Sequence, residues 1–200
     1  MSIGSPVALV LFVLTLLVSI IGFKNPKVIE RTILRPYRVF RNREYERLIT
    51  SGFVHANGWH LAMNMLTFYF FGFALEEHIG SLKFALLYFL ALVLSHIGTS
   101  LKHRNDPNYA SLGASGAVLG VMFAYIVYAP TATILLLPIP IPIPGWLYAV
   151  GFLAYSYYQS TQKRADYINH DAHISGALTG LAFVGLTDPY AFQYAIHSIF

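Results

Sequence analysis

Ser115 and His173 are the two side chains in this sequence whose type and setting point to chemistry. Ser115 lies in the small-residue run 112–117, and His173 lies in the glycine-containing run 172–180. Each opens a long apolar segment, and polar groups within apolar segments of a membrane protein are costly and usually functional. A serine hydroxyl becomes a nucleophile when a base takes its proton, and an imidazole titrates near neutral pH. The two residues therefore indicate a nucleophile and its base.

A second polar pair supplies the groups that such a nucleophile needs. His60 and Asn64 are four residues apart, so they project from one face of a helix. Acyl transfer requires hydrogen-bond donors for the developing oxyanion, and a ring N–H and an amide N–H are such donors. Backbone N–H groups at the start of a helix, near Ser115, are a third source. Together these groups predict an oxyanion hole.

Glycines follow both candidate catalytic residues at a spacing of four. Gly116 and Gly120 lie in one segment, and Gly176 and Gly180 lie in the other. Small residues at this spacing allow membrane helices to approach closely. We therefore expect the two helices to pack together and to bring the serine within hydrogen-bond reach of the histidine.

The composition is that of a membrane protein. Charged residues make up 11% of the chain, against roughly 25% in an average soluble domain, and apolar residues make up 56%. The absence of cysteine excludes disulfides and thiolate metal sites. Eight of the thirteen basic residues lie between Lys24 and Arg47, where a basic stretch between apolar spans meets lipid headgroups. We expect membrane lipids and no nucleic acid as partners.

Six apolar segments approach the roughly 20 residues that a membrane span needs. We expect an all-α, polytopic membrane protein with a single domain, 1–200, and a long interfacial loop at 24–57. The first segment has no basic region before it and no clear cleavage site, so we interpret it as a retained span and not as a signal peptide. The prolines of 138–144 favour an extended connection. The expected spans cover about 6–23, 58–75, 84–101, 114–135, 145–161 and 172–188.

The second, fourth and sixth spans begin on the same side of the membrane, and each opens with one of the polar clusters. Taken alone, the serine with its glycines is more often a helix-packing motif, and each histidine cluster is explained equally well by hydrogen bonds between helices. Their common side favours one site, because a bundle that gathers the three helix starts brings the clusters together. Asp171 is not expected to complete a triad, because a residue two positions before His173 points away from it in a helix.

In this order the residues resemble the rhomboid family of intramembrane serine proteases. The motifs His-x-x-x-Asn, Gly-x-Ser-Gly and Ala-His-x-x-Gly-x-x-x-Gly appear at 60–64, 113–116 and 172–180. The resemblance implies a six-helix bundle, a Ser115–His173 dyad without a third acid, and transmembrane proteins as substrates. It implies oxyanion stabilisation by the two motif residues of 60–64 and by the serine amide, with no metal and no cofactor.

Several other positions match or depart from the rhomboid pattern. His55 matches a histidine thought to be structural, and Gly113 belongs with the glycines that pack at the site. Arg47 matches the arginine of a Trp-Arg pair, but Glu46 replaces the tryptophan. Leu119 stands where many members have an aromatic residue beneath the histidine, so the resemblance implies a less rigidly held base.

Two other functions remain open. A metal-dependent membrane enzyme or transporter would take its ligands from the histidines and the acid near them, although His-Glu-x-x-His is absent. Its candidate ligands are His55, His60, His170, Asp171 and His173. A noncatalytic rhomboid-like protein that binds membrane clients is the second alternative, and the intact serine, histidines and asparagine argue against it.

The orientation of the site is the point on which two arguments conflict. The loops on the side of Ser115 carry twelve of the thirteen lysines and arginines, so the positive-inside rule would place the site at the cytoplasm. The resemblance implies the opposite side. We expect a multi-pass protein of the cell or inner membrane whose site opens to the extracytoplasmic side.

Overall fold

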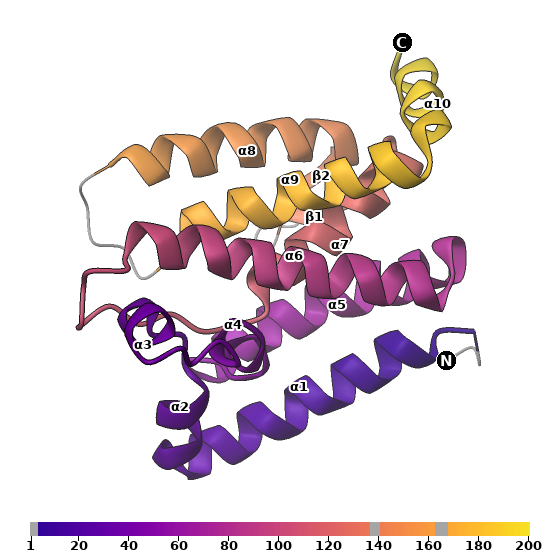
Figure 1. The fold of residues 1–200 in the computed structure, drawn as a ribbon. Helices are drawn as coiled ribbons and strands as arrows, with labels where there is room; N and C mark the ends of the chain where they lie inside the picture. Colours follow the sequence, from indigo (N-terminus) through magenta and orange to yellow (C-terminus); the bar gives the residue numbers. More distant parts are fainter. Residues whose placement is uncertain (1–3, 137–140, 163–167) are drawn as a thin grey trace.

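The computed structural model describes residues 4–136, 141–162 and 168–200, and most of these residues are helical (Figure 1). Six of the helices in this part of the chain have 14 or more residues: α1 (Pro6–Lys24), α5 (Gly58–Ile79), α6 (Ser81–Lys102), α7 (Ser115–Tyr128), α8 (Gly145–Thr161) and α9 (His170–Thr187). Shorter elements join α1 to α5: α2 (Pro26–Thr32), α3 (Pro36–Arg41), α4 (Arg47–Thr50) and a 3₁₀ turn (Ser51–Phe53). A hairpin of β1 (Thr133–Leu136) and β2 (Ile141–Pro144) precedes α8, and α10 (Pro189–Ile199) follows α9.

The expected fourth span, 114–135, is wrong at its end. Helix α7 ends at Tyr128, and Ala129 leaves the helical conformation with φ −136° and ψ 63°. Pro130 explains the break, because the residue before a proline is pushed out of the helical region. The chain then forms β1, which pairs with the extended Ile141–Pro144. The hairpin departs from the all-α expectation, and α10 is a helix beyond the six expected spans. The expected extended form of 138–140 lies outside the described residues.

Helix α7 is the centre of the molecule. Eleven of its residues, from Gly116 to Val127, are buried. Helices α5, α6, α8 and α9 all contact it, and α9 lies along it (Figure 1). A helix that is apolar on all sides is covered by neighbouring helices or by lipid, and neighbouring helices cover most of α7. The start of α7, where Ser115 lies, is therefore held by several helices at once.

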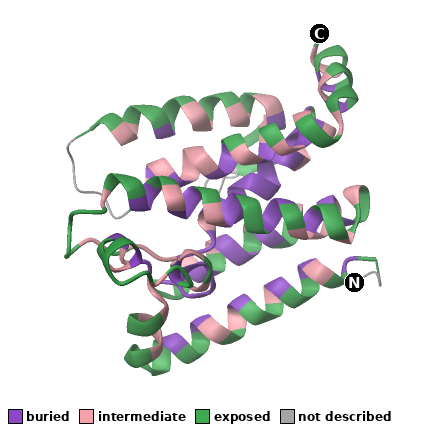
Figure 2. Cartoon of the chain, viewed as in Figure 1, coloured by how far each residue is buried: buried purple, intermediate pink, exposed green. Residues whose placement is uncertain are grey.

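The outer helix surfaces are apolar. Helices α1 and α6 are each long and apolar enough to cross a membrane, and α7 is a shorter apolar helix. Exposed residues run along the outer sides of α1 and α8 (Figure 2). On α1 they are large hydrophobic side chains, among them Leu9, Val10, Val13, Leu17 and Ile21. Continuous exposed apolar surfaces of this kind mark contact with a membrane or a partner.

Arg47 organises the segment between α1 and α5. Its side chain is 3% exposed, and its Nη1 donates to the carbonyl oxygens of Glu30 at 3.0 Å and Ile33 at 2.7 Å. Its Nε also donates to the carboxylate of Glu44. Hydrogen bonds to a charged donor are stronger than neutral ones, so this guanidinium ties α2 and α4 into one cap.

Candidate active site

Ser115 and His173 lie within hydrogen-bond distance of each other. Ser115 is the first residue of α7, and His173 lies in the first turn of α9. The distance from Ser115 Oγ to His173 Nε2 is 2.8 Å. Asn169 fixes the start of α9, because its side-chain oxygen accepts the N–H of Ala172 at 3.1 Å. Asn169 also donates to Thr99 Oγ1 of α6 at 2.8 Å, a contact that the sequence motifs did not indicate.

Glycine contacts allow this approach of the two helices. A Cβ built on Gly176 would lie 2.0 Å from the carbonyl oxygen of Gly116, and one on Gly180 would lie 2.1 Å from that of Gly120. A Cβ on Gly116 would lie 2.3 Å from Ser95 Oγ of α6. No side chain fits at such distances. Helices α7 and α9 therefore meet at backbone contact directly beneath the serine and the histidine, and the Ser95 side chain of α6 packs against Gly116.

Gly113 and His60 close the site on the side of α5. Gly113 has φ +115°, a conformation that other residues rarely adopt. A Cβ on Gly113 would lie 2.7 Å from Cε1 and 2.9 Å from Nε2 of His60. The imidazole of His60 thus packs directly against the backbone two residues before Ser115. The positive φ gives Gly113 a specific reason to be glycine, which its motif alone did not provide.

Asn64 is buried on the same face of α5 as His60. Its Nδ2 donates to the carbonyl oxygen of His60 at 2.9 Å. An amide nitrogen carries two hydrogens, so this bond orients the group and uses one of them. His60 lies beside Gly113, close to the first backbone N–H groups of α7, and a role of Asn64 at this helix start stays a prediction.

His55 connects the backbone directly before Ser115 to helix α1. Its Nε2 accepts the backbone N–H of Ala114 at 3.4 Å, and its Nδ1 lies 2.9 Å from Ser19 Oγ. Burial, with a smaller contribution from His60, lowers the pKa of His55 to about 3, so the ring is neutral at pH 7. Because Nε2 accepts, Nδ1 carries the hydrogen and donates to Ser19, which donates to the carbonyl oxygen of Phe53 at 2.9 Å.

The comparisons with known proteins identify the family of this chain. A family model described as the rhomboid domain matches residues 42–188. The chain belongs to the rhomboid family. It is 31% identical over 143 residues to Rhomboid protein 1, mitochondrial, of Saccharomyces cerevisiae, which covers 68% of this chain and 40% of that protein. It is 34% identical over 83 residues to Rhomboid-like protease 3 of Toxoplasma gondii, which covers 42% of the chain and 30% of the relative.

The rhomboid relatives differ in activity. The chain is also 31% identical over 83 residues, 42% of its length, to 24% of Inactive RHOMBOID-like protein 8 of Arabidopsis thaliana. The chain spans less than half the length of each of these three relatives. Membership of the family confirms the resemblance found in the motifs. The family includes proteases and inactive members, so an activity must be argued from the residues of the site.

Two candidate metal ligands have other contacts. Asp171 forms an ion pair with Lys102 of α6. His170 packs edge-on against Tyr155 of α8, with ring centroids 5.9 Å apart. In the part of the chain that the structure describes, three or more His, Asp or Glu side chains do not converge as a metal site. The salt bridge with Lys102 directs the Asp171 carboxylate toward α6.

An aromatic side chain that the sequence motifs did not reveal lies near the candidate base. Leu119 occupies the usual aromatic position on α7, but Phe152 of α8 places its ring centroid 6.3 Å from that of His173. Phe152 also stacks with Tyr148 at 5.7 Å. The motif could not show this contact, because the aromatic residue comes from a different helix.

Substitution of Phe152 by Ala is expected to lower the turnover number about tenfold with little change in KM, because the imidazole loses a neighbour that limits its orientation. Phe152→Tyr should retain the wild-type rate. The measurement is steady-state cleavage of a transmembrane substrate, with Phe89→Ala on the outer face of α6 as the matched control. An unchanged turnover number in Phe152→Ala would show that Phe152 does not orient the base.

Proposed function

We propose that this chain is an intramembrane serine endopeptidase that hydrolyses peptide bonds in or near transmembrane segments. The observation that carries the proposal is the 2.8 Å contact between Ser115 Oγ and His173 Nε2 at the starts of two closely packed helices. Membership of a family that includes proteases supports it. The presence of both Ser115 and His173 supports this proposal over that of a noncatalytic client-binding protein.

The proposed reaction follows from the atoms at the site. His173 Nε2 takes the proton of Ser115 Oγ, which attacks the substrate carbonyl carbon. The Ser115 backbone N–H, Asn64 and His60 stabilise the oxyanion that forms. Collapse of this intermediate breaks the C–N bond, and the leaving amine takes the proton from His173. Water then hydrolyses the acyl-enzyme with His173 again as base, which restores the serine.

We further propose that the whole chain, 1–200, is one domain with six membrane spans and an interfacial loop 1. The support is a core that runs without interruption from Ala8 of α1 to Ala195 of α10. A substrate must be a polypeptide whose helix unwinds locally, because the carbonyls of an intact helix are already hydrogen bonded. Small or helix-destabilising residues near the cleaved bond are therefore expected.

Removal of an oxyanion donor tests the assignment of the polar pair on α5. Asn64→Ala is expected to lower turnover by about 10²-fold, at the lower end of the usual loss for one such donor. The loss is limited because His60 and the Ser115 amide still donate. The double variant with His60→Ala should lose considerably more. Full activity in the double variant, measured with a transmembrane substrate, would exclude both residues from oxyanion stabilisation.

The decisive test of the function is cleavage by the purified protein. Wild type and Ser115→Ala are incubated in detergent with a model transmembrane substrate and, separately, with a fluorophosphonate probe. Cleavage and labelling by the wild type alone are the expected result. Activity that is lost in a chelator and restored by added metal would favour the metal-dependent alternative. Binding of the substrate without cleavage would favour the client-binding alternative.

We place the opening of the site on the extracytoplasmic side, as the family implies. Single cysteines at Asn42 and Asn105, both exposed, report this side in a chain without native cysteine. Both are expected to react with a membrane-impermeant thiol reagent in intact cells. Cysteines at Glu77 and Lys83, which lie in or near the opposite loop, are the control and should react only after permeabilisation. The reverse pattern would show that the positive-inside rule decides the orientation.

A further inference from the structure

The hairpin between α7 and α8 has a defined hydrogen-bond register. Strand β1 pairs antiparallel with β2, with Ile134 opposite Ile143. The N–H of Gly145 donates to the carbonyl oxygen of Ala132 at 2.9 Å, which continues the ladder toward α8. In an antiparallel pair, hydrogen-bonded positions alternate with positions that are not. The bonded positions are therefore the even-numbered residues of β1.

The prolines of β2 require the same register. Pro142 and Pro144 stand opposite Leu135 and Thr133, and a proline has no N–H to give to a ladder. The N–H and C=O groups of Thr133 and Leu135 therefore point away from β2. The two edges of the hairpin differ as a result. The edge of β2 lacks two donors, whereas the edge of β1 presents a full set of donors and acceptors.

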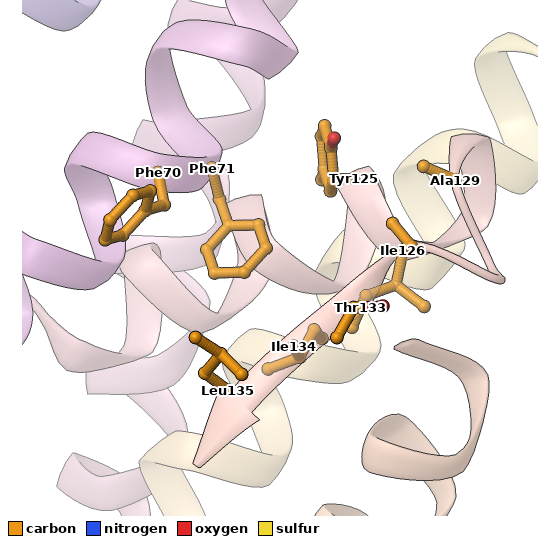
Figure 3. Close-up of a pocket in the computed structure, with 9 residues that line it drawn as sticks. Phe70, Phe71, Tyr125, Ile126, Ala129, Thr133, Ile134 and Leu135 are labelled. Carbon is orange, nitrogen blue, oxygen red and sulfur yellow. The ribbon is translucent and has the colours of Figure 1, made fainter. Parts of the chain in front are cut away.

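A cavity of about 260 Å³ borders this edge of β1. Its other walls are Phe70 and Phe71 of α5 and the end of α7, including Tyr125 (Figure 3). Along β1 it touches the three consecutive residues 133–135, and it touches none of the described residues of β2. Since consecutive side chains of a strand point to opposite faces, such a cavity lies at the free edge and not on one face.

The cavity is within reach of a substrate bound at Ser115. Ser115 begins α7 and Ile126, which lines the cavity, lies near its end, so the helix rise separates them by about 16 Å. An extended polypeptide advances about 3.3 Å per residue, so about five residues span this distance. An unwound peptide cleaved at Ser115 is therefore long enough to reach β1.

We propose that the free edge of β1 and its cavity bind the substrate polypeptide as an added antiparallel or parallel strand, about five residues from the cleaved bond. The inference rests on the proposed protease function. An unwound transmembrane segment exposes its own N–H and C=O groups, which are costly in an apolar environment without partners. The edge of β1 supplies the complementary groups, as in other cases of strand addition. A lipid chain would fill the cavity but could not pair with this edge.

Cross-linking in a cysteine-free chain tests the proposal directly. Leu135→Cys is introduced together with Ser115→Ala, so that bound substrate is not cleaved. Substrates carry one cysteine at successive positions, three to eight residues from the cleaved bond on either side. We expect disulfides at every second position, strongest about five residues away. A period near 3.6, uniform cross-linking, or none would overturn the proposal, because a strand paired with β1 has a period of two.

A backbone variant gives a second, independent readout. Leu135→Pro deletes an N–H of the free edge without touching the ladder, whereas Leu135→Ala keeps that N–H and removes only the side chain. We expect Leu135→Pro to raise KM about tenfold and Leu135→Ala to raise it by clearly less, because the alanine variant loses only side-chain contact with the cavity and keeps the N–H. Equal effects of the two variants would overturn the role of the edge. A wild-type protein that neither labels nor cleaves would instead overturn the protease function, whereas the cross-linking pattern is read without catalysis.

Discussion

Replacement of Ser115 by Ala, or of His173 by Ala, is expected to lower cleavage of a transmembrane substrate by a factor on the order of 10⁶, the loss seen when one member of a serine–histidine pair is removed. The two groups lie 2.8 Å apart and perform one proton transfer, so the double variant should be no less active than either single variant. The measurement is single-turnover cleavage, with folding checked by thermal denaturation in detergent.

The matched control for these variants is Ser175→Ala, two residues after the histidine on α9. It removes a hydroxyl of the same kind from the same helix and is expected to retain wild-type activity. Fluorophosphonate labelling that persists in Ser115→Ala would assign the nucleophile to another residue.

Gly176→Val is expected to lower turnover by about 10²-fold and also to reduce thermal stability. Its new side chain would occupy the position where a Cβ lies 2.0 Å from the Gly116 carbonyl, so α9 must move away from α7. A displacement on the order of 1 Å at a catalytic pair is enough for a loss of this size. Cleavage rate and melting temperature are measured together.

Gly98→Val on α6 provides the comparison for this variant. A Cβ at Gly98 has no neighbour within 4 Å, so the same substitution in a helix of similar composition should change neither quantity. Wild-type turnover in Gly176→Val would show that close contact of α7 and α9 is not needed for the proposed chemistry.

The parts of the site that follow from local patterns could be predicted from the sequence. The spacing of Gly116, Gly120, Gly176 and Gly180 indicated close helix contact, and the polar clusters indicated which helix starts would meet. Both inferences depend on periodicities within single segments. The structure places each of the four glycines where a side chain would collide with a neighbouring helix.

Other parts could not be predicted, for two physical reasons. Hydropathy does not distinguish an apolar strand from an apolar helix, so β1 was included in the span 114–135, although Pro130 marked the break. Contacts between helices that are distant in sequence leave no local pattern, so Phe152 beside His173 was not foreseen. The hydrogen bond between His55 and Ser19 also joins residues distant in sequence, so no local pattern indicated it.

The hydrogen bond between His55 and Ser19 bears on the smallest fragment of this chain that would keep the candidate site in place. Ser19 lies in α1, before the residues 42–188 that the family shares. A fragment trimmed to that shared stretch keeps every residue assigned to the chemistry but leaves a buried imidazole N–H without an acceptor, at a cost of about 1–3 kcal/mol. The same imidazole accepts the backbone N–H of Ala114, the residue directly before Ser115, so its loss of a partner would also affect that contact. The stretch that the family model matches is therefore smaller than the structural unit that holds the site, because that unit includes α1.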